Sequence, residues 1–199
     1  CTPDNVGETV NVLVAAGAYT DEAGNNNAAS NTFDWTYETT SPTMTITSTA
    51  GTADGGTSAV AAFALTFTSN EATTNFVVGD ITATGGDGCT LGAFLNGGAD
   101  TVYTATCTPD NAGETVNVLV AAGAYTDAAG NNNAVSNTFD WTYETTSPTM
   151  TITSTAGTAD GGDSNVAAFA LTFTSNEATT NFVVGDITAT GGDGCTLGA

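Results

Sequence analysis

The sequence repeats itself with a period of 106 residues, and this repeat constrains the fold more than any other feature. Residues 1–93 align without a gap on residues 107–199. The two copies differ at only five positions, which are Val6/Ala112, Glu22/Ala128, Ala29/Val135, Thr57/Asp163 and Ala59/Asn165. Copies this similar indicate a tandem array of one structural unit, in which each unit contacts only its neighbours. A spacer or polymer gains length from such copies, whereas an enzyme gains little.

The unit boundaries are predicted where a proline follows a strand-like run. This happens at Thr39-Thr40-Ser41-Pro42 and again at Thr145-Thr146-Ser147-Pro148, and proline is disfavoured inside a sheet. Cutting there gives the C-terminal part of one unit (1–40), one complete unit (41–146) and the N-terminal part of a third (147–199). We therefore expect the sequence to be a window on a longer array, or else a subunit whose partial ends are completed by neighbouring copies.

Basic residues are absent: the chain has 21 Asp and Glu residues, no Lys, Arg or His, and a formal net charge of −21. This composition excludes binding of nucleic acid, which needs cations to neutralise phosphates, and attraction to anionic lipid surfaces. It also excludes catalytic sites built on His, Lys or Arg, and zinc sites built on His. No apolar run is long enough to cross a membrane, so no membrane insertion is expected. Because 40% of the residues are apolar and regularly patterned, we expect a folded chain.

Apolar and polar residues alternate with a period of two through the complete unit, between turns rich in Gly, Asn and Asp. The expected strands are residues 43–48, 60–69, 75–78, 80–84, 89–96, 101–108, 115–122 and 135–144. Their inward faces are expected to carry Met44, Ile46, Ala61, Phe63, Leu65, Phe67, Val116, Val118, Val120, Phe139, Trp141 and Tyr143. Seven or eight short strands in about 100 residues predict an all-β fold of tandem, immunoglobulin-like antiparallel β-sandwich domains.

Three stretches of the unit resemble one known family. They are Phe76-Val-Val-Gly-Asp-Ile-Thr, Tyr103-Thr-Ala-Thr and Val120-Ala-Ala-Gly-Ala-Tyr-Thr-Asp-Ala-Ala-Gly-Asn131. Over the whole 106-residue unit, the sequence resembles the bacterial Ig-like tandem repeats of giant secreted surface adhesins and extracellular filament proteins. The resemblance implies export, often by type I secretion, and a stalk made of many such domains. The chain departs from the family at Cys89 and Cys107, where the family usually has ordinary apolar residues.

The two cysteines of the complete unit are predicted to form a disulfide, on an argument from strand register. In a hairpin that turns through Gly97-Gly98-Ala99, Cys89 lies directly opposite Cys107, and Leu91 lies opposite Ala105. The Cβ atoms of opposed residues lie near the distance that a disulfide needs. A disulfide indicates an oxidising compartment, which here means outside the cytoplasm. A pair of buried free thiols is the alternative.

Cys1 and Cys195 have no such partner within the sequence. They correspond to Cys107 and Cys89 in the repeat, so their partners are expected either in residues outside this window or in a neighbouring subunit. A unit shared between two subunits would lack the equivalents of residues 94–106. This gap favours partners outside the window.

Carboxylates are the only side chains left for catalysis, and their placement predicts none. A glycosidase needs two carboxyl groups about 5–10 Å apart, one of them with a raised pKa. The acidic residues of this chain fall mostly in loops, and no sequence context indicates a buried pair. We therefore expect that the protein is no enzyme.

Calcium binding is a better use of these oxygen atoms, because Ca²⁺ takes about six to eight oxygen ligands from carboxylates, amides and backbone. The resemblance implies calcium at the junctions between repeats. At the pole of the unit that faces the preceding unit, we hypothesise a calcium site made of Glu38, Asp127 and Asn131. At the opposite pole, the candidates for the next junction are Asp110, Glu144 and Glu177. Acidic loops that are merely solvated are the alternative.

The function expected from these observations is structural. The repeats would form a rigid stalk or filament outside the cell, on a bacterial surface, with neighbouring copies as the partners and no known receptor. The alternative is an adhesive binding module that recognises carbohydrate or protein through its loops. Exposed aromatic residues in a loop would favour the alternative, and Phe94 is the only loosely placed candidate.

Overall fold

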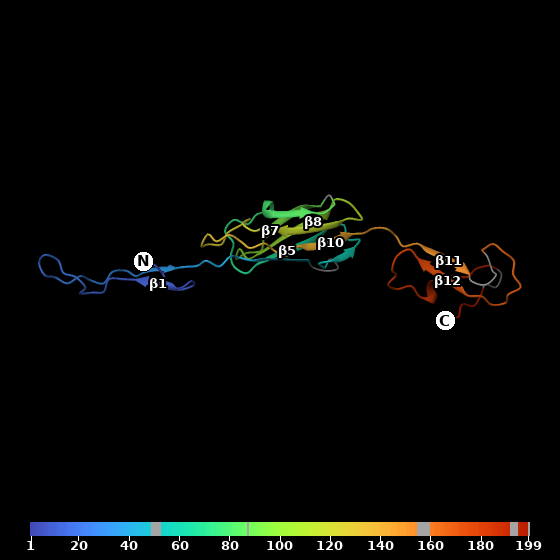
Figure 1. Ribbon diagram of the computed structural model, residues 1–199, viewed down its shortest axis with the longest axis horizontal. Helices are drawn as coiled ribbons and strands as arrows, with labels where there is room; N and C mark the ends of the chain where they lie inside the picture. Colours follow the sequence, from blue (N-terminus) through green and yellow to red (C-terminus); the bar gives the residue numbers. More distant parts are fainter. Residues whose placement is uncertain (49–52, 87, 155–159, 192–194, 199) are drawn as a thin grey trace. The chain divides into compact units, whose positions relative to one another are not determined.

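The computed structural model of the protein describes residues 1–48, 53–86, 88–154, 160–191 and 195–198. These residues divide into two compact units, Cys1–Thr145 and Thr146–Ala199 (Figure 1). Their secondary structure consists of strands and two short 3-10 helices, so the prediction of an all-β chain is confirmed. None of the described helices has the length and apolar character needed to cross a membrane.

The strands are short and their bounds follow the chain as listed next. They are β1 (Thr9–Val12), β2 (Phe33–Thr36), β3 (Met44–Ser48), β4 (Gly56–Ser58), β5 (Phe63–Ser69), β6 (Ile81–Thr84), β7 (Cys89–Asn96), β8 (Val102–Pro109), β9 (Thr115–Val120), β10 (Phe139–Tyr143), β11 (Met150–Ser154) and β12 (Leu171–Ser175). The 3-10 helices are η1 (Val78–Asp80) and η2 (Val184–Asp186).

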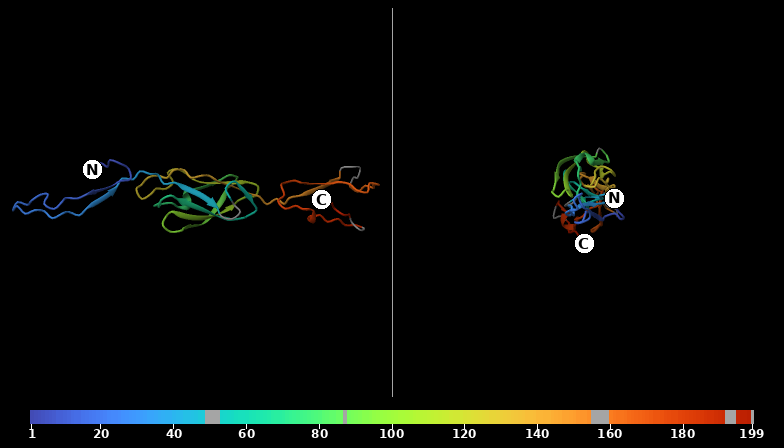
Figure 2. Two further views of the ribbon diagram at one scale, coloured as in Figure 1. Left: turned by 90° about the horizontal axis from the view of Figure 1, so that it is seen from below. Right: turned by 90° about the vertical axis from the view of Figure 1, so that its left-hand side faces the viewer.

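Two four-stranded sheets make up the complete repeat (Figure 2). The first has the strand order β3-β5-β8-β7 and is antiparallel throughout. The second has the order β4-β10-β9-β6, in which β4 runs parallel to β10 and the other pairs are antiparallel. Residues of both sheets meet in one apolar core, as in a β-sandwich of immunoglobulin type.

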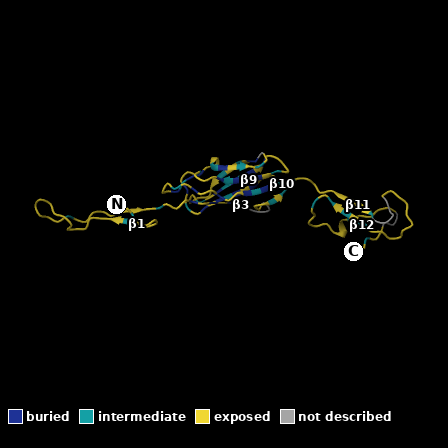
Figure 3. Ribbon diagram, viewed as in Figure 1, coloured by how far each residue is buried: buried dark blue, intermediate teal, exposed yellow. Residues whose placement is uncertain are grey.

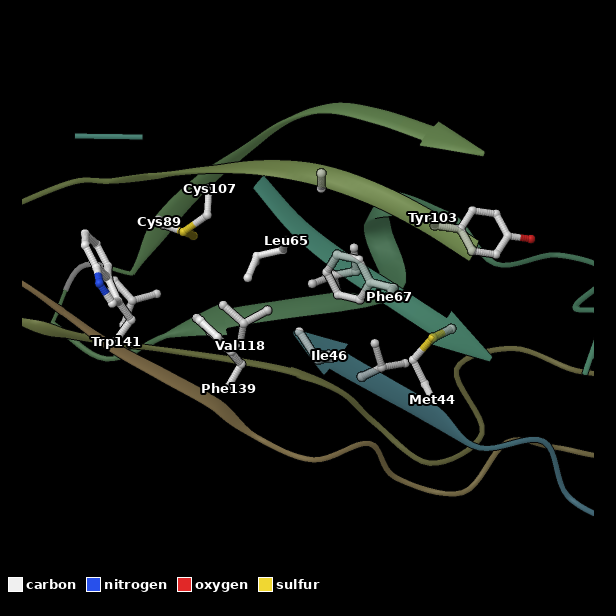
Figure 4. Packing of buried hydrophobic residues seen from close by; sticks show 14 of the residues in the cluster. Met44, Ile46, Leu65, Phe67, Cys89, Tyr103, Cys107, Val118, Phe139 and Trp141 are labelled. Carbon is white, nitrogen blue, oxygen red and sulfur yellow. A yellow bond between two sulfur atoms is a disulfide. The ribbon is translucent and has the colours of Figure 1, made fainter. Parts of the chain in front are cut away.

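The core is built from alternate residues of the strands, as the period-two pattern predicted. Burial alternates along β5, with Phe63, Leu65 and Phe67 facing inward. Trp141 of β10 is fully buried, and its ring centroid lies 4.4 Å from that of Phe63. Figure 3 shows that the buried positions concentrate in this repeat, and Figure 4 shows the packed side chains, with Trp141 at the end of the core that holds the disulfide.

Some details of the expected strands are wrong. Ala61 is exposed because the chain enters its sheet only at Phe63. Residues 75–78 form no strand, since the chain turns into η1, where the Asp80 carboxylate accepts a 2.8 Å hydrogen bond from the backbone N–H of Val77. Strand β4 was not expected, because its three residues Gly, Thr and Ser show no alternation of apolar and polar positions.

The disulfide between Cys89 and Cys107 is present, but the strand register that predicted it is wrong by two residues. Leu91, in place of Cys89, lies opposite Cys107, so the two cysteines are diagonal neighbours with their Cα atoms 5.6 Å apart. This distance lies within the usual range for a disulfide. Two features move the register: the turn is longer than assumed, closing with Gly97 N–H donating to the Val102 carbonyl, and a bulge interrupts β7.

Residues 1–40 and 147–199 contain parts of the same architecture. Strands β1 and β2 pair in the register of β9 and β10, so that Val10 lies opposite Trp35 as Val116 lies opposite Trp141. Strands β11 and β12 likewise repeat the pairing of β3 and β5. In these segments the apolar faces are uncovered: Trp35 is 43% exposed, whereas its equivalent Trp141 is 0% exposed.

Candidate metal centre

Three carboxylates come together next to the complete repeat. Glu38 follows β2, Glu71 follows β5, and Asp127 lies in the loop after β9. One oxygen atom from each of them lies within 4.8 Å of an oxygen of both others. Asp127 is buried, and Glu38 and Glu71 are half-buried. Among the described residues this is the one group of acidic, His or Cys side chains with the spacing of a metal site.

Asp127 is held in place by a tight local turn. Its Oδ1 atom accepts a 2.8 Å hydrogen bond from the backbone N–H of Asn131, and its Oδ2 atom accepts a 2.9 Å bond from the Asn131 amide. Gly130 takes a positive φ of 92° within this turn, a conformation that glycine adopts without steric cost. The Thr-Asp-x-Ala-Gly-Asn sequence therefore positions the carboxylate before any neighbouring segment arrives.

The first copy of this turn shows the same geometry. The Asp21 carboxylate accepts hydrogen bonds of 2.8 Å and 3.0 Å from the backbone and side chain of Asn25. Asp21 is exposed, because the residues that would cover it in a complete repeat are absent around it. The turn is thus a property of the sequence itself, and the burial of Asp127 is a property of its surroundings.

Glu38 reaches the site from the segment that precedes the complete repeat. Its Oε2 atom accepts a 2.6 Å hydrogen bond from the Asn131 amide, and its Oε1 atom accepts a short hydrogen bond from the backbone N–H of Thr40. The Asn131 amide therefore lies between the carboxylates of Glu38 and Asp127, where its two N–H groups offset part of their repulsion. Glu38, Asp127 and Asn131 are the three residues predicted to meet at this pole, and the structure brings them together.

The electrostatics of the cluster are unbalanced, because the chain has no Lys, Arg or His to pair with it. Burial raises the pKa of Glu71, and the negative charges of Asp127 and Glu38 raise it further, while a hydrogen bond from Asn70 lowers it. Burial also acts to raise the pKa of Asp127, but the hydrogen bonds from Asn131 prevail and hold this pKa below its usual value. The cluster thus combines a carboxylate that stays ionised with one that resists ionisation.

The donor set fits a hard divalent cation. All three side chains offer carboxylate oxygens, the ligands that Ca²⁺ and Mg²⁺ prefer, and sulfur or imidazole ligands are absent from the group. An open groove, lined by Trp35, Tyr37, Ala72 and Ala128 among others, leads from the surface to the three carboxylates. Glu71 was expected at this pole but not as a ligand, since its inward direction depends on how the loop after β5 packs.

The other predicted ligands do not join this cluster. Asp110 is exposed, and its carboxylate accepts a 3.0 Å hydrogen bond from the Thr90 hydroxyl. The backbone N–H of Glu144 donates to the Ser58 carbonyl, and that of Glu177 donates to the Ser175 hydroxyl. A second calcium site formed by these three acidic residues stays a prediction.

Phe94, the aromatic residue considered for ligand binding, packs onto the core. Its ring stacks on that of Tyr103 with the centroids 5.6 Å apart, and it meets the edge of Phe76. A half-buried ring in such contacts contributes to stability, and it offers no separate platform for a ligand.

Comparison with known protein families decides the broad class. The family described as bacterial Ig-like domain matches residues 38–143, which is more than half of the chain. The chain belongs to the bacterial Ig-like domain family. The matched span begins at Glu38, three residues before the boundary predicted from the repeat, so it includes all three carboxylates of the cluster. Bacterial Ig-like domains are a non-catalytic family. No curated protein matches the sequence.

Proposed function

We propose that this protein is a structural repeat of an extracellular stalk or filament on a bacterial cell surface, and that Ca²⁺ stiffens the joint between its Ig-like units. The observation that carries the proposal is the meeting of Glu38 with Glu71 and Asp127. Glu38 belongs to the segment before the complete repeat, whereas the other two belong to the repeat itself. A cation held by all three would tie the two segments to each other.

A structural role is supported by the near-identity of the copies. Residues 1–93 and 107–199 differ at five positions, and none of these is a core residue of the complete repeat. Surfaces that recognise a ligand gain nothing from being repeated unchanged along a spacer, whereas length does. The disulfide between Cys89 and Cys107 supports a location outside the cytoplasm, where such bonds persist.

Calcium would supply positive charge that the chain lacks. With 21 acidic residues and no basic ones, neighbouring units repel each other unless ions screen or bridge them. Asp127, fixed by its turn, would act as the preformed ligand, with Glu71 and Glu38 completing the carboxylate set. The Asn131 side chain would present its amide oxygen to the cation in place of the N–H groups that now contact the carboxylates.

The proposal is tested by thermal unfolding of the 199-residue chain with CaCl₂ and with chelator, at constant ionic strength. We expect Ca²⁺ to raise the melting temperature, since a ligand at 100 times its Kd stabilises the folded state by about 2.7 kcal/mol. Asp127→Asn should abolish this shift. Asp21→Asn is the matched control, because it changes the same turn where no other carboxylates gather. A melting temperature independent of Ca²⁺, or equal loss in both variants, would overturn the calcium joint.

A further inference from the structure

The two incomplete segments are complementary parts of one Ig-like repeat. Residues 1–40 correspond to residues 107–146 of the complete repeat, and residues 147–199 correspond to residues 41–93. Together they contain every position of the repeat except the equivalents of residues 94–106. The complete repeat therefore shows, pair by pair, how the two segments fit each other.

The sheet β4-β10-β9-β6 shows the fit most clearly. Its two inner strands, β9 and β10, correspond to β1 and β2, which lie in the segment 1–40. Its two outer strands, β4 and β6, correspond to residues 162–164 and 187–190 of the other segment. The hairpin β1–β2 thus has two free edges, and the residues that would pair with both edges lie in 147–199.

Those outer residues are not strands where their partners are missing. Residues 162–164 and 187–190 are described, and neither stretch has a strand assignment, although identical or nearly identical residues form β4 and β6 in the complete repeat. The missing element is therefore the neighbouring strand and not a strand-forming sequence. Addition of a strand to a free sheet edge is a common mode of protein recognition, in which backbone hydrogen bonds supply affinity.

The apolar faces complement each other in the same way. Phe33 and Trp35 are 63% and 43% exposed, while their equivalents Phe139 and Trp141 are buried. On the other segment Ile152 and Phe169 are 56% and 49% exposed, while their equivalents Ile46 and Phe63 are buried. In the complete repeat the rings of Trp141 and Phe63 are in contact. Covering these faces removes large apolar side chains from water, which is favourable.

The free cysteines are placed at matching positions. Cys1 and Cys195 are exposed and unbonded, and they are the equivalents of Cys107 and Cys89, which form the disulfide of the complete repeat. Charge does not prevent the association: the two segments together carry eleven acidic residues, against ten in the complete repeat. A composite repeat would therefore be nearly as acidic as one that folds.

We propose that residues 1–40 of one copy of the chain and residues 147–199 of a second copy associate into a composite Ig-like repeat, closed by a disulfide between Cys1 and Cys195. Trp35 packs against Phe169 of the second copy, and the edges of the β1–β2 hairpin take up residues 162–164 and 187–190. The contact joins two different faces, so it propagates head to tail into an open filament. This partner deepens the proposed structural role and rests on it for the biological meaning of the filament.

The composite repeat differs from the complete one in a single respect. The equivalents of residues 94–106 include most of β8, so the sheet β3-β5-β8-β7 would be represented by β11, β12 and short stretches at Cys1 and Cys195. The sheet that joins the two copies by strand pairing lacks nothing. We therefore expect the junction to form through that sheet and the shared core, with the disulfide as a lock.

The test measures the mass of the purified 199-residue chain under oxidising conditions, with and without reductant. We expect a ladder of multiples of 19.7 kDa in denaturant that collapses to single chains on reduction. Peptide mapping should recover Cys1 linked to Cys195. Cys1→Ser should abolish the covalent ladder and leave larger, non-covalent species in light scattering under native conditions. Single chains alone, or a Cys1–Cys195 bond closed within one chain, would overturn the proposal.

Two blocked chains test the head-to-tail geometry. Trp35→Asp removes one face and Phe169→Asp removes the other, so each variant alone should stay a single chain, and a mixture of the two should give dimers and stop there. Thr45→Asp, at an exposed position of β3 in the complete repeat, is the matched control and should still form the ladder. Dimers of either variant alone, or no dimers in the mixture, would contradict the interface.

The calcium joint is tested separately in the Trp35→Asp chain. Because this chain does not polymerise, a Ca²⁺-dependent rise in its melting temperature reports on the Glu38 cluster alone. A ladder without a calcium shift would overturn the calcium joint only, and a calcium shift without a ladder would overturn the composite repeat only.

Discussion

Asp21 and Asp127 are the same residue of the repeat in two surroundings. Both carboxylates accept hydrogen bonds from the asparagine four positions later, and these bonds lower the pKa of Asp21 and, against the effect of burial, that of Asp127. Asp127 is buried beside Glu38 and Glu71, whereas Asp21 is exposed. The turn thus fixes the ionised form, and the neighbouring segments decide whether the charge binds a cation or is merely hydrated.

Glu71 gives this cluster a pH dependence in the absence of metal. Its folded-state pKa is raised above the ordinary value of 4.5, so the folded state binds more protons there and stability falls as pH rises through this range. We expect Glu71→Gln without Ca²⁺ to stabilise the chain at neutral pH by about 0.5 kcal/mol, the scale of a partly exposed charge interaction. The gain should vanish below pH 4.5, where the carboxyl of the parent chain is protonated.

Urea denaturation at several pH values measures this effect. Asp127 has the opposite sign: its lowered pKa contributes stability above the ordinary value of 3.8 that is lost as pH falls through the folded pKa. Asp127→Asn should therefore destabilise the chain at neutral pH without metal. With Ca²⁺ present, Glu71→Gln should become destabilising as well, because it removes a ligand. A Glu71→Gln chain that is less stable than the parent in chelator would refute this assignment.

Sequence reasoning reached part of this site. Glu38, Asp127 and Asn131 could be predicted, because a local turn motif and the polarity of a sandwich place them at one pole. Glu71 could not be chosen over Asp100 of the same pole. Asp100 binds the Asn96 amide instead, and only the packing of the loops decides which carboxylate turns towards Asp127.

Among the elements, the β7–β8 hairpin depends most on a covalent link. The disulfide from Cys89 to Cys107 closes a loop of 18 residues in sequence separation, and a loop of this size contributes about 3 kcal/mol in the chain-entropy model. We expect the double variant Cys89→Ala/Cys107→Ala to lose about this much stability in urea denaturation. The matched control, Cys1→Ala/Cys195→Ala, should leave the unfolding of the complete repeat unchanged. Equal stability of the two double variants would contradict the prediction.

The same hairpin shows where element-level prediction ends. The bounds of β7 followed from its alternation, whereas its register did not, because Ala93 takes a positive φ of 49° beside the bulge. A bulge changes the pairing by one residue and leaves no clear mark in apolar periodicity. The disulfide prediction nevertheless holds, since diagonal cysteines on one face are close enough to bond. Strand β4 escaped prediction because its pairing with β10 is set by tertiary contacts.

At the scale of the whole molecule, charge is the main opposing force. Every ionisable side chain that is charged at neutral pH is acidic, so the folded chain gains no ion pairs between side chains and suffers only repulsion. The carboxylates lie in the loops and at the ends of strands, while the core of the complete repeat is apolar. The fold therefore rests on burial, backbone hydrogen bonds and one disulfide, against a repulsion that the solvent must screen.

This balance predicts a chain that is stabilised by salt. Raising NaCl from 0.01 M to 0.15 M shortens the Debye length from about 30 Å to about 8 Å, so repulsion between units and loops should fall. In chelator at neutral pH we expect the melting temperature to rise by a few degrees, since about 1 kcal/mol corresponds to about 4–8 °C for a domain of this size. Near pH 3, where most carboxyl groups are protonated, the same salt series should have little effect. A melting temperature that is independent of NaCl at neutral pH would mean that repulsion between carboxylates does not limit the stability of this chain, and that any effect of Ca²⁺ comes from its bound site alone.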